Sequence, residues 1–78
     1  MTNVLLDDIK KLVSLQLGKR EVGGQDRFLE DLGAESADVA NIVAAVEGKY
    51  QITVKESEIA KIRTPADLFE LVRKKIPS

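Results

Sequence analysis

A chain of 78 residues has room for one domain with one small core, so residues 1–78 are expected to fold as a single domain. It contains neither cysteine nor histidine, which excludes disulfides, thiolate metal sites and catalysis by an imidazole base. The 12 basic and 13 acidic residues nearly cancel, which disfavours a nucleic-acid-binding protein. No apolar run approaches the roughly 20 residues of a membrane span, and no signal peptide is recognisable, so we expect a cytoplasmic protein.

The first predicted element is a helix over about residues 3–17. Its apolar residues recur at intervals of three and four and fall on one stripe: Leu5, Ile9, Leu12 and Val13. Asn3 can cap the start of this helix. Gly18 can end it, because glycine readily adopts the left-handed conformation found at helix C-termini.

Residues 18–35 are predicted to form a long loop, because four glycines interrupt the helical pattern. Phe28, Leu29 and Leu32 are expected to pack under the helices and fix the path of the loop. The end of this loop and the start of the next helix are also acidic, with Arg27 as the single base. The carboxylates are Asp26, Glu30, Asp31, Glu35 and Asp38. A long loop with its own apolar anchors is often functional.

The second helix is predicted to start near Ser36 and to end near Tyr50. One face is predicted to belong to the core, because its members fall within roughly 60° of one line: Val39, Ile42, Val43, Val46 and Tyr50. The opposite side is smooth and lightly charged. Its residues are Ala37, Ala40, Asn41, Ala44, Glu47 and Gly48.

The C-terminal third is predicted to contain a short extended link at residues 52–54 and one or two helical turns at residues 56–62, with Ile59 and Ile62 turned inward. Thr64, followed by a proline and then by Asp67, is typical of a helix start. This last helix is expected to run to about residue 76, before Pro77. β-Strand signals are few, so the predicted fold is an all-α bundle of three main helices and one short helix, with the long loop between the first two helices.

Ser36 is the residue with the clearest chemical potential, because it lies between a glycine-containing turn and a helix N-terminus. It can serve simply as an N-cap. Alternatively, the unpaired N–H groups and positive dipole of the helix start can stabilise a phosphate ester on its hydroxyl. The nearby carboxylates do not make a strong nucleophile of this serine without a base such as histidine, but they can attract a basic partner. The residues alone leave both interpretations open.

The same region resembles the acyl carrier protein family. The family signature Gly-x-Asp-Ser-Leu opens the second helix and appears here as Gly33-Ala34-Glu35-Ser36-Ala37. The lead-in at residues 28–33, the aromatic Tyr50 and the helix-opening Thr64 also match, and the resemblance extends from about residue 26 to residue 76.

The resemblance implies that a phosphopantetheinyl transferase attaches 4′-phosphopantetheine from coenzyme A to Ser36. The thiol of that arm then carries acyl groups as thioesters, for fatty-acid, lipid or polyketide-type biosynthesis. The chain would be no enzyme itself. It would be a substrate of acyl-loading and acyl-processing enzymes, such as a synthetase, a ketosynthase or an acyltransferase, and we expect it to be a monomer.

The resemblance also implies two further groups of residues. The α-helical docking surface for partner enzymes comprises Glu35, Ala37, Asp38, Ala40, Asn41, Ala44, Glu47 and Gly48. The pocket for the acyl chain comprises Val39, Val43, Val46, Ile62, Leu68 and Leu71. No catalytic residue and no metal ligand is implied.

The sequence departs from the family pattern on both sides of the serine, with Glu35 in place of aspartate and Ala37 in place of leucine. Asn41, Gly48 and Lys49 occupy a helix that is usually more acidic. These departures suggest a specialised carrier instead of the main carrier of fatty-acid synthesis. Two alternatives are a cofactor-free interaction module of the same fold and a carrier of aminoacyl or peptidyl groups. A helix-turn-helix DNA-binding protein is disfavoured, because the second helix offers only one base.

Overall fold

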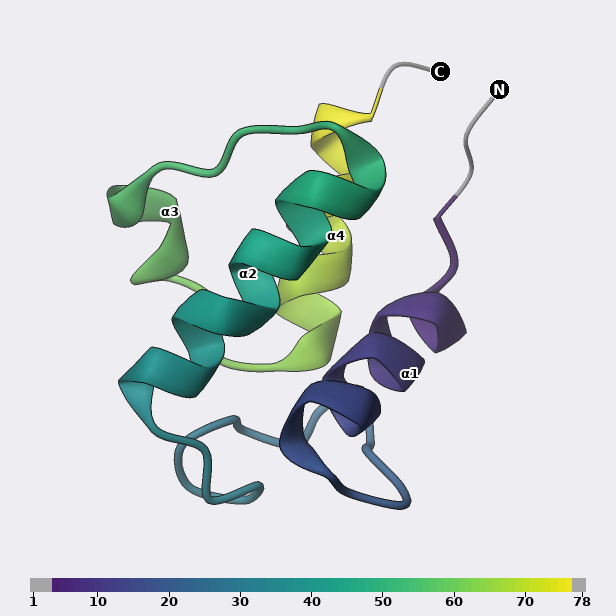
Figure 1. The fold of residues 1–78 in the computed structure, drawn as a ribbon, viewed down its shortest axis with the longest axis vertical. Helices are drawn as coiled ribbons and strands as arrows, with labels where there is room; N and C mark the ends of the chain where they lie inside the picture. Colours follow the sequence, from purple (N-terminus) through teal and green to yellow (C-terminus); the bar gives the residue numbers. More distant parts are fainter. Residues whose placement is uncertain (1–3, 77–78) are drawn as a thin grey trace.

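The computed structural model describes residues 4–76, which form four helices and no strand. They are α1 (Leu6–Leu17), α2 (Ser36–Tyr50), α3 (Glu56–Ile59) and α4 (Pro65–Lys75). In Figure 1, α2 crosses the molecule diagonally, α4 lies behind it and α1 beside it, while α3 is set apart on the opposite side. Residues 18–35 run below the helices as a long connection. The predicted all-α fold, with three main helices, one short helix and this loop, is confirmed.

One core cluster joins α1, α2, α4 and the loop. Every residue of the predicted α2 stripe is buried: Val39, Ile42, Val43, Val46 and Tyr50. From α1 and α4 the cluster receives four fully buried residues, Ile9, Val13, Leu68 and Val72. Helix α1 contacts both α2 and α4. The burial of these apolar faces, and not intrinsic helix propensity, supplies most of the stability of such short helices.

The loop contributes two of its three predicted anchors to the core. Phe28 is 1% exposed and Leu32 is 7% exposed, but Leu29 is 57% exposed, so the prediction for Leu29 is wrong. The reason is a helical turn at this point, in which the N–H groups of Asp31 and Leu32 both donate to the carbonyl oxygen of Arg27. In such a turn, residues four apart share one side, so Phe28 and Leu32 face the core while Leu29 points outward.

All four helices begin with the same local arrangement. The third helical residue is acidic, and its carboxylate accepts the N–H of the residue that precedes the helix. These acids are Asp8, Asp38, Glu58 and Asp67, with N–O distances of 3.2, 2.9, 3.0 and 3.2 Å. At α4 the pair is reciprocal, because Thr64 Oγ1 accepts the N–H of Asp67 at 3.1 Å. The predicted start of the last helix, with Thr64 as its cap, is therefore confirmed.

Helix α1 starts at Leu6, later than predicted, because Leu5 has extended backbone angles and is 63% exposed. Leu5 is therefore no part of the buried stripe. The expected cap Asn3 and the expected terminator Pro77 lie outside the described residues. The end of α1 follows the prediction, since Gly18 adopts the left-handed conformation with φ 67°.

Helix α3 is a single turn, shorter than the predicted residues 56–62. Beyond Ile59 the chain continues through bonds of the tighter three-residue type, in which Lys61 and Ile62 donate to Glu58 and Ile59. Ile62 is buried and Ile59 is half-buried, which agrees with the prediction that both side chains turn inward. An ion pair of 3.0 Å between Glu58 and Lys75 connects α3 to the end of α4.

Candidate functional site

Ser36 is the first residue of α2, and its side chain is exposed. The N-cap is Glu35, whose N–H donates to Asp38 Oδ2 at 2.9 Å, so the interpretation of Ser36 as the N-cap is wrong. Within residues 4–76 the Ser36 hydroxyl has no hydrogen-bond partner. The first N–H groups of a helix have no carbonyl partner inside it. The hydroxyl is therefore available for reaction beside a set of N–H donors that favours negative charge.

The loop fixes the approach to Ser36 through backbone hydrogen bonds. The N–H of Ala34 donates to the carbonyl oxygen of Phe28 at 2.8 Å, across a turn in which Gly33 has φ 66°. The N–H of Phe28 in turn donates to the carbonyl oxygen of Arg63 at 2.8 Å. These bonds tie the residues before α2 to the residues before α4, two segments far apart in the sequence.

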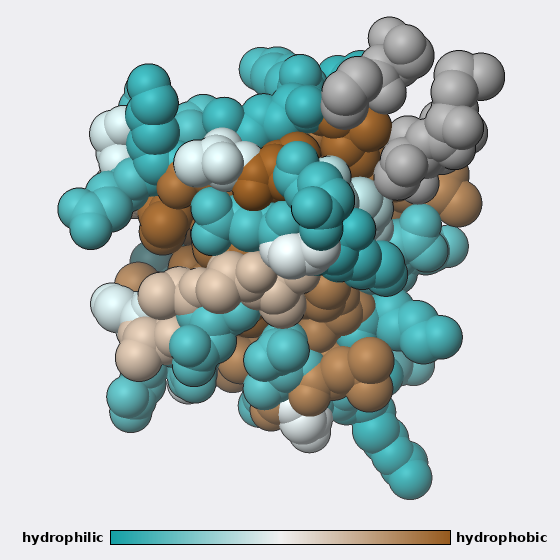
Figure 2. All heavy atoms as spheres, turned by 45° about the horizontal axis from the view of Figure 1, so that its top comes forward, coloured by the Kyte–Doolittle hydropathy of each residue, from teal (hydrophilic) through white to brown (hydrophobic). Residues whose placement is uncertain are grey.

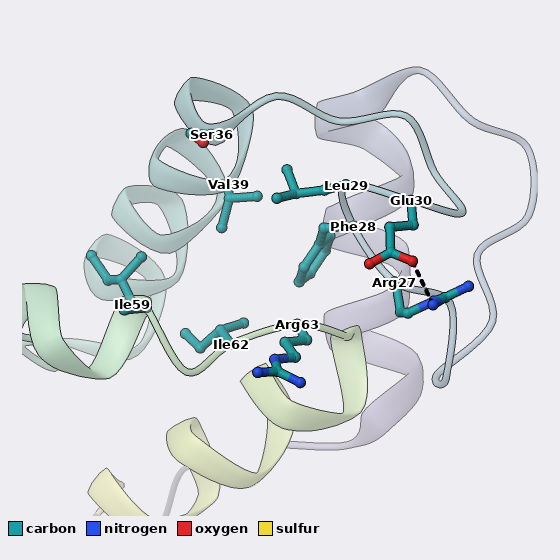
Figure 3. A pocket seen from close by; sticks show the side chains of 10 residues that line it. Arg27, Phe28, Leu29, Glu30, Ser36, Val39, Ile59, Ile62 and Arg63 are labelled. Atoms are coloured by element: carbon teal, nitrogen blue, oxygen red, sulfur yellow. Dashed lines mark ion pairs between the residues drawn. The ribbon is translucent and has the colours of Figure 1, made fainter.

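A pocket of about 600 Å³ lies beside Ser36 and is partly open to solvent (Figure 3). Its centre is apolar, with Ser36 on one side and Arg63 on the other in this view. The lining residues are Arg27, Phe28, Leu29, Glu30, Ser36, Val39, Ile59, Ala60, Ile62 and Arg63. The volume falls within the range of small-molecule sites, roughly 300–1,000 Å³. An exposed hydroxyl at the edge of an apolar pocket fits an attached arm with an aliphatic cargo.

Only two of the six residues expected to form an acyl pocket line this one, Val39 and Ile62. Val43, Val46 and Leu68 are fully buried in the core, and Leu71 is half-buried against it. The remaining lining comes from the loop and from the segment at residues 59–63. A periodic pattern within one helix cannot reveal these residues, because they meet only in the folded chain.

The surface expected to dock partner enzymes follows the outer side of α2. Six of its eight residues are exposed: Glu35, Ala37, Ala40, Asn41, Ala44 and Gly48. Asp38 and Glu47 are half-buried and already accept backbone N–H groups, Asp38 from Glu35 and Glu47 from Val54 at 3.0 Å. Figure 2 shows a pale band of weakly hydrophobic surface along the course of α2, with hydrophilic side chains on both sides. We call these eight residues the α2 face.

The acidic patch predicted near Ser36 is partly neutralised. Arg27 lies 3.0 Å from Asp31 and 2.5 Å from Glu30, measured between nitrogen and oxygen. The hydrogen bonds from Arg27 lower the pKa of Asp31, and those to Asp31 raise the pKa of Arg27. Asp26 accepts the N–H of Gly23 at 2.7 Å. Among the acids of this patch, Glu35 is exposed and takes no part in these interactions with Arg27 and Gly23.

Residues 4–76 hold no group of three or more histidine, cysteine, aspartate or glutamate side chains placed to bind a metal ion. No helix in the same range is long and apolar enough to cross a membrane.

Comparisons with known proteins agree with this geometry. A family model described as a phosphopantetheine attachment site matches residues 7–72. The acyl carrier protein of Wolinella succinogenes is 39% identical over 70 residues, which cover 87% of this chain and 92% of that protein. The acyl carrier protein of Sulfurovum sp. is 36% identical over 70 residues, with coverage of 87% and 93%.

A solved structure is also similar. The crystal structure of an acyl carrier protein from Thermotoga maritima aligns with a TM-score of 0.75 at 32% identity and covers 90% of this chain and 84% of that chain. Sequence and fold therefore lead to the same assignment. The chain belongs to the acyl carrier protein family, whose members carry acyl groups on a 4′-phosphopantetheine prosthetic group.

Proposed function

We propose that Ser36 carries the 4′-phosphopantetheine arm. The observation that supports this choice is the position of Ser36, exposed at the first residue of α2 and at the edge of the pocket. The other described serines lack this combination. Ser14 donates its hydroxyl to the carbonyl oxygen of Lys19, and Ser57 lies in the single turn of α3; neither lines the pocket.

Attachment would form a bond from Ser36 Oγ to the phosphorus that bears the pantetheine of coenzyme A. The bond from that phosphorus to the rest of coenzyme A breaks, and adenosine 3′,5′-bisphosphate leaves. The chain has no histidine to act as the base, and in this proposal the serine proton passes to a base of the transferase. The N–H groups at the start of α2 then stabilise the negative charge of the phosphodiester. Once bound, the arm supplies a terminal thiol for thioester chemistry.

The chain's own residues have three tasks in this proposal, none of them catalytic. Ser36 holds the arm, the pocket shelters the apolar part of the cargo, and the α2 face binds the transferase and the acyl-loading and acyl-processing enzymes. Its smooth, small side chains permit close approach of a partner, and Glu35 offers a charge for a basic surface.

The pathway is of the fatty-acid or polyketide type, and we propose a specialised carrier within it. Support comes from the exposed positions beside Ser36, where Glu35 and Ala37 replace the family's aspartate and leucine. We also propose a monomer, because the apolar stripe of α2 is fully buried within one chain. A cytoplasmic location completes the proposal. Light scattering tests whether the protein is a monomer, and cell fractionation tests its location.

The attachment test uses intact mass after incubation with coenzyme A and a broad-specificity phosphopantetheinyl transferase. Wild type and the control Ser57→Ala should each gain one phosphopantetheine group, and Ser36→Ala should gain none. A gain by Ser36→Ala would show that another residue carries the arm. No gain by folded wild type, with a known carrier modified in the same tube, would favour the cofactor-free interaction module.

A further inference from the structure

Arg63 is held at the edge of the pocket by its backbone. Its N–H donates to Asp67 Oδ2 at 3.0 Å, and its carbonyl oxygen accepts the N–H of Phe28 at 2.8 Å. The first bond joins it to the start of α4 and the second to the buried anchor of the loop. The side chain therefore extends from a fixed point on the wall of the pocket.

The pocket has two cationic side chains, and they differ in their partners. Arg27 is paired with both Glu30 and Asp31. Arg63 forms no ion pair with any carboxylate among residues 4–76, and the nearby Asp67 carboxylate accepts the backbone N–H groups of Arg63 and Thr64. Arg63 is thus the cation of the pocket that can accept a new anionic partner.

The apolar side chains between Ser36 and Arg63 define what kind of ligand fits. In Figure 3, Val39 and Phe28 lie between these two residues, and Ile62 lies beside Arg63. An aliphatic chain can cover this middle section, whereas a polar chain would lose its hydration there. A carboxylate at the end of such a chain would meet the guanidinium, which binds carboxylates through paired N–H donors.

We propose that this carrier favours acyl chains that end in a carboxylate, with Arg63 as the residue that binds the carboxylate. The inference rests on the proposed function, because the cargo must be attached at Ser36 to reach the pocket. It names a class of cargo, the ω-carboxyacyl thioesters, that the family assignment leaves open.

The test compares cargoes that differ only at the far end of the chain. Hexanoyl and adipyl forms, and octanoyl and suberyl forms, are prepared from the acyl-coenzyme A compounds with the broad-specificity transferase. Hydroxylamine then cleaves the thioester, and the cleavage rate reports how far the pocket shelters the cargo. Each rate is divided by that of the corresponding free pantetheine thioester, and the amide NMR shift of Ile62 provides an independent readout of pocket occupancy.

Arg63→Gln should speed the cleavage of the carboxylate-ended forms about two- to fivefold, the effect of a partly exposed ion pair. It should leave the methyl-ended forms unchanged, and Arg63→Lys should retain part of the protection. High salt should reduce the effect in wild type. The control Arg20→Gln removes the same charge from an exposed site that does not line this pocket. It should leave the cleavage rates of both the carboxylate-ended and the methyl-ended forms unchanged.

Equal effects of Arg63→Gln on both classes, or no effect on either, would overturn the inference while the carrier role stands. Failure of the proposed function is seen earlier and separately, as the absence of any mass gain on Ser36 before hydroxylamine is added. In that case the inference about Arg63 fails with it.

Discussion

Replacement of Gly48 by alanine should stabilise the protein. Gly48 lies within α2 on its exposed side, and a Cβ atom built there meets no atom within 4 Å apart from the adjacent backbone of the helix itself. Alanine lowers the conformational entropy of the unfolded chain without a steric penalty in the helix. The expected gain is about 0.5–1 kcal/mol in the free energy of unfolding. For a domain of this size, that gain raises the midpoint of thermal unfolding by about 2–8 °C.

Far-UV circular dichroism during heating and during urea titration measures this change. The matched control is Ala44→Gly, one helical turn earlier on the same exposed side, which should lower stability by a similar amount. The double variant should return close to wild type, since both sites point to solvent. A Gly48→Ala protein that is no more stable than wild type, with an unchanged urea m-value, would refute the reasoning about an open helical position.

Three further predictions address the turn, the caps and the pH dependence. Gly33→Ala should cost about 1–2 kcal/mol in urea unfolding, because φ is 66° there while the space around it is open; Gly33→Asn should lose less. Thr64→Ala should cost about 0.5–2 kcal/mol in the same assay, because the first turn of α4 loses its hydroxyl acceptor. The backbone N–H of Lys55 and the ammonium of Lys75 lower the pKa of Glu58 from its ordinary value of 4.5. The contribution of the Glu58 carboxylate to the free energy of unfolding is therefore fully present at pH values above its ordinary pKa. This contribution is lost as the pH falls through the lowered pKa of the folded protein. Glu58→Gln should flatten this part of the pH–stability curve, and an unchanged curve would contradict the assignment.

Helical periodicity predicted the core of α2 because one helix contains all the necessary information. Residues three and four apart share a face whatever the rest of the fold does, so the stripe from Val39 to Tyr50 could be assigned to the core directly. Local capping chemistry was equally informative at α4, where Thr64 and Asp67 form their reciprocal pair within a single turn.

The composition of the pocket could not be predicted in this way. Its walls depend on the hydrogen bond between Phe28 and Arg63, which brings the loop onto the segment before α4. The helical turn that starts at Arg27 directs the side chain of Leu29 outward, beside the pocket. Neither the hydrogen bond nor the turn leaves a periodic signal in the sequence, and four of the six positions that the family resemblance implied for the pocket lie in or against the core instead.

The acids of the α2 face divide into two groups with different consequences for recognition. Asp38 and Glu47 already accept backbone N–H groups, so their carboxylates help to build the fold as well as the surface. Glu35 forms no ion pair within residues 4–76 and is exposed, so a change there alters the surface at little cost to stability. The same holds for exposed Ala37 on the other side of Ser36. These two departures from the family pattern therefore fall at exposed positions beside Ser36, where the fold imposes little constraint, which is the distribution expected of the specialised carrier proposed above.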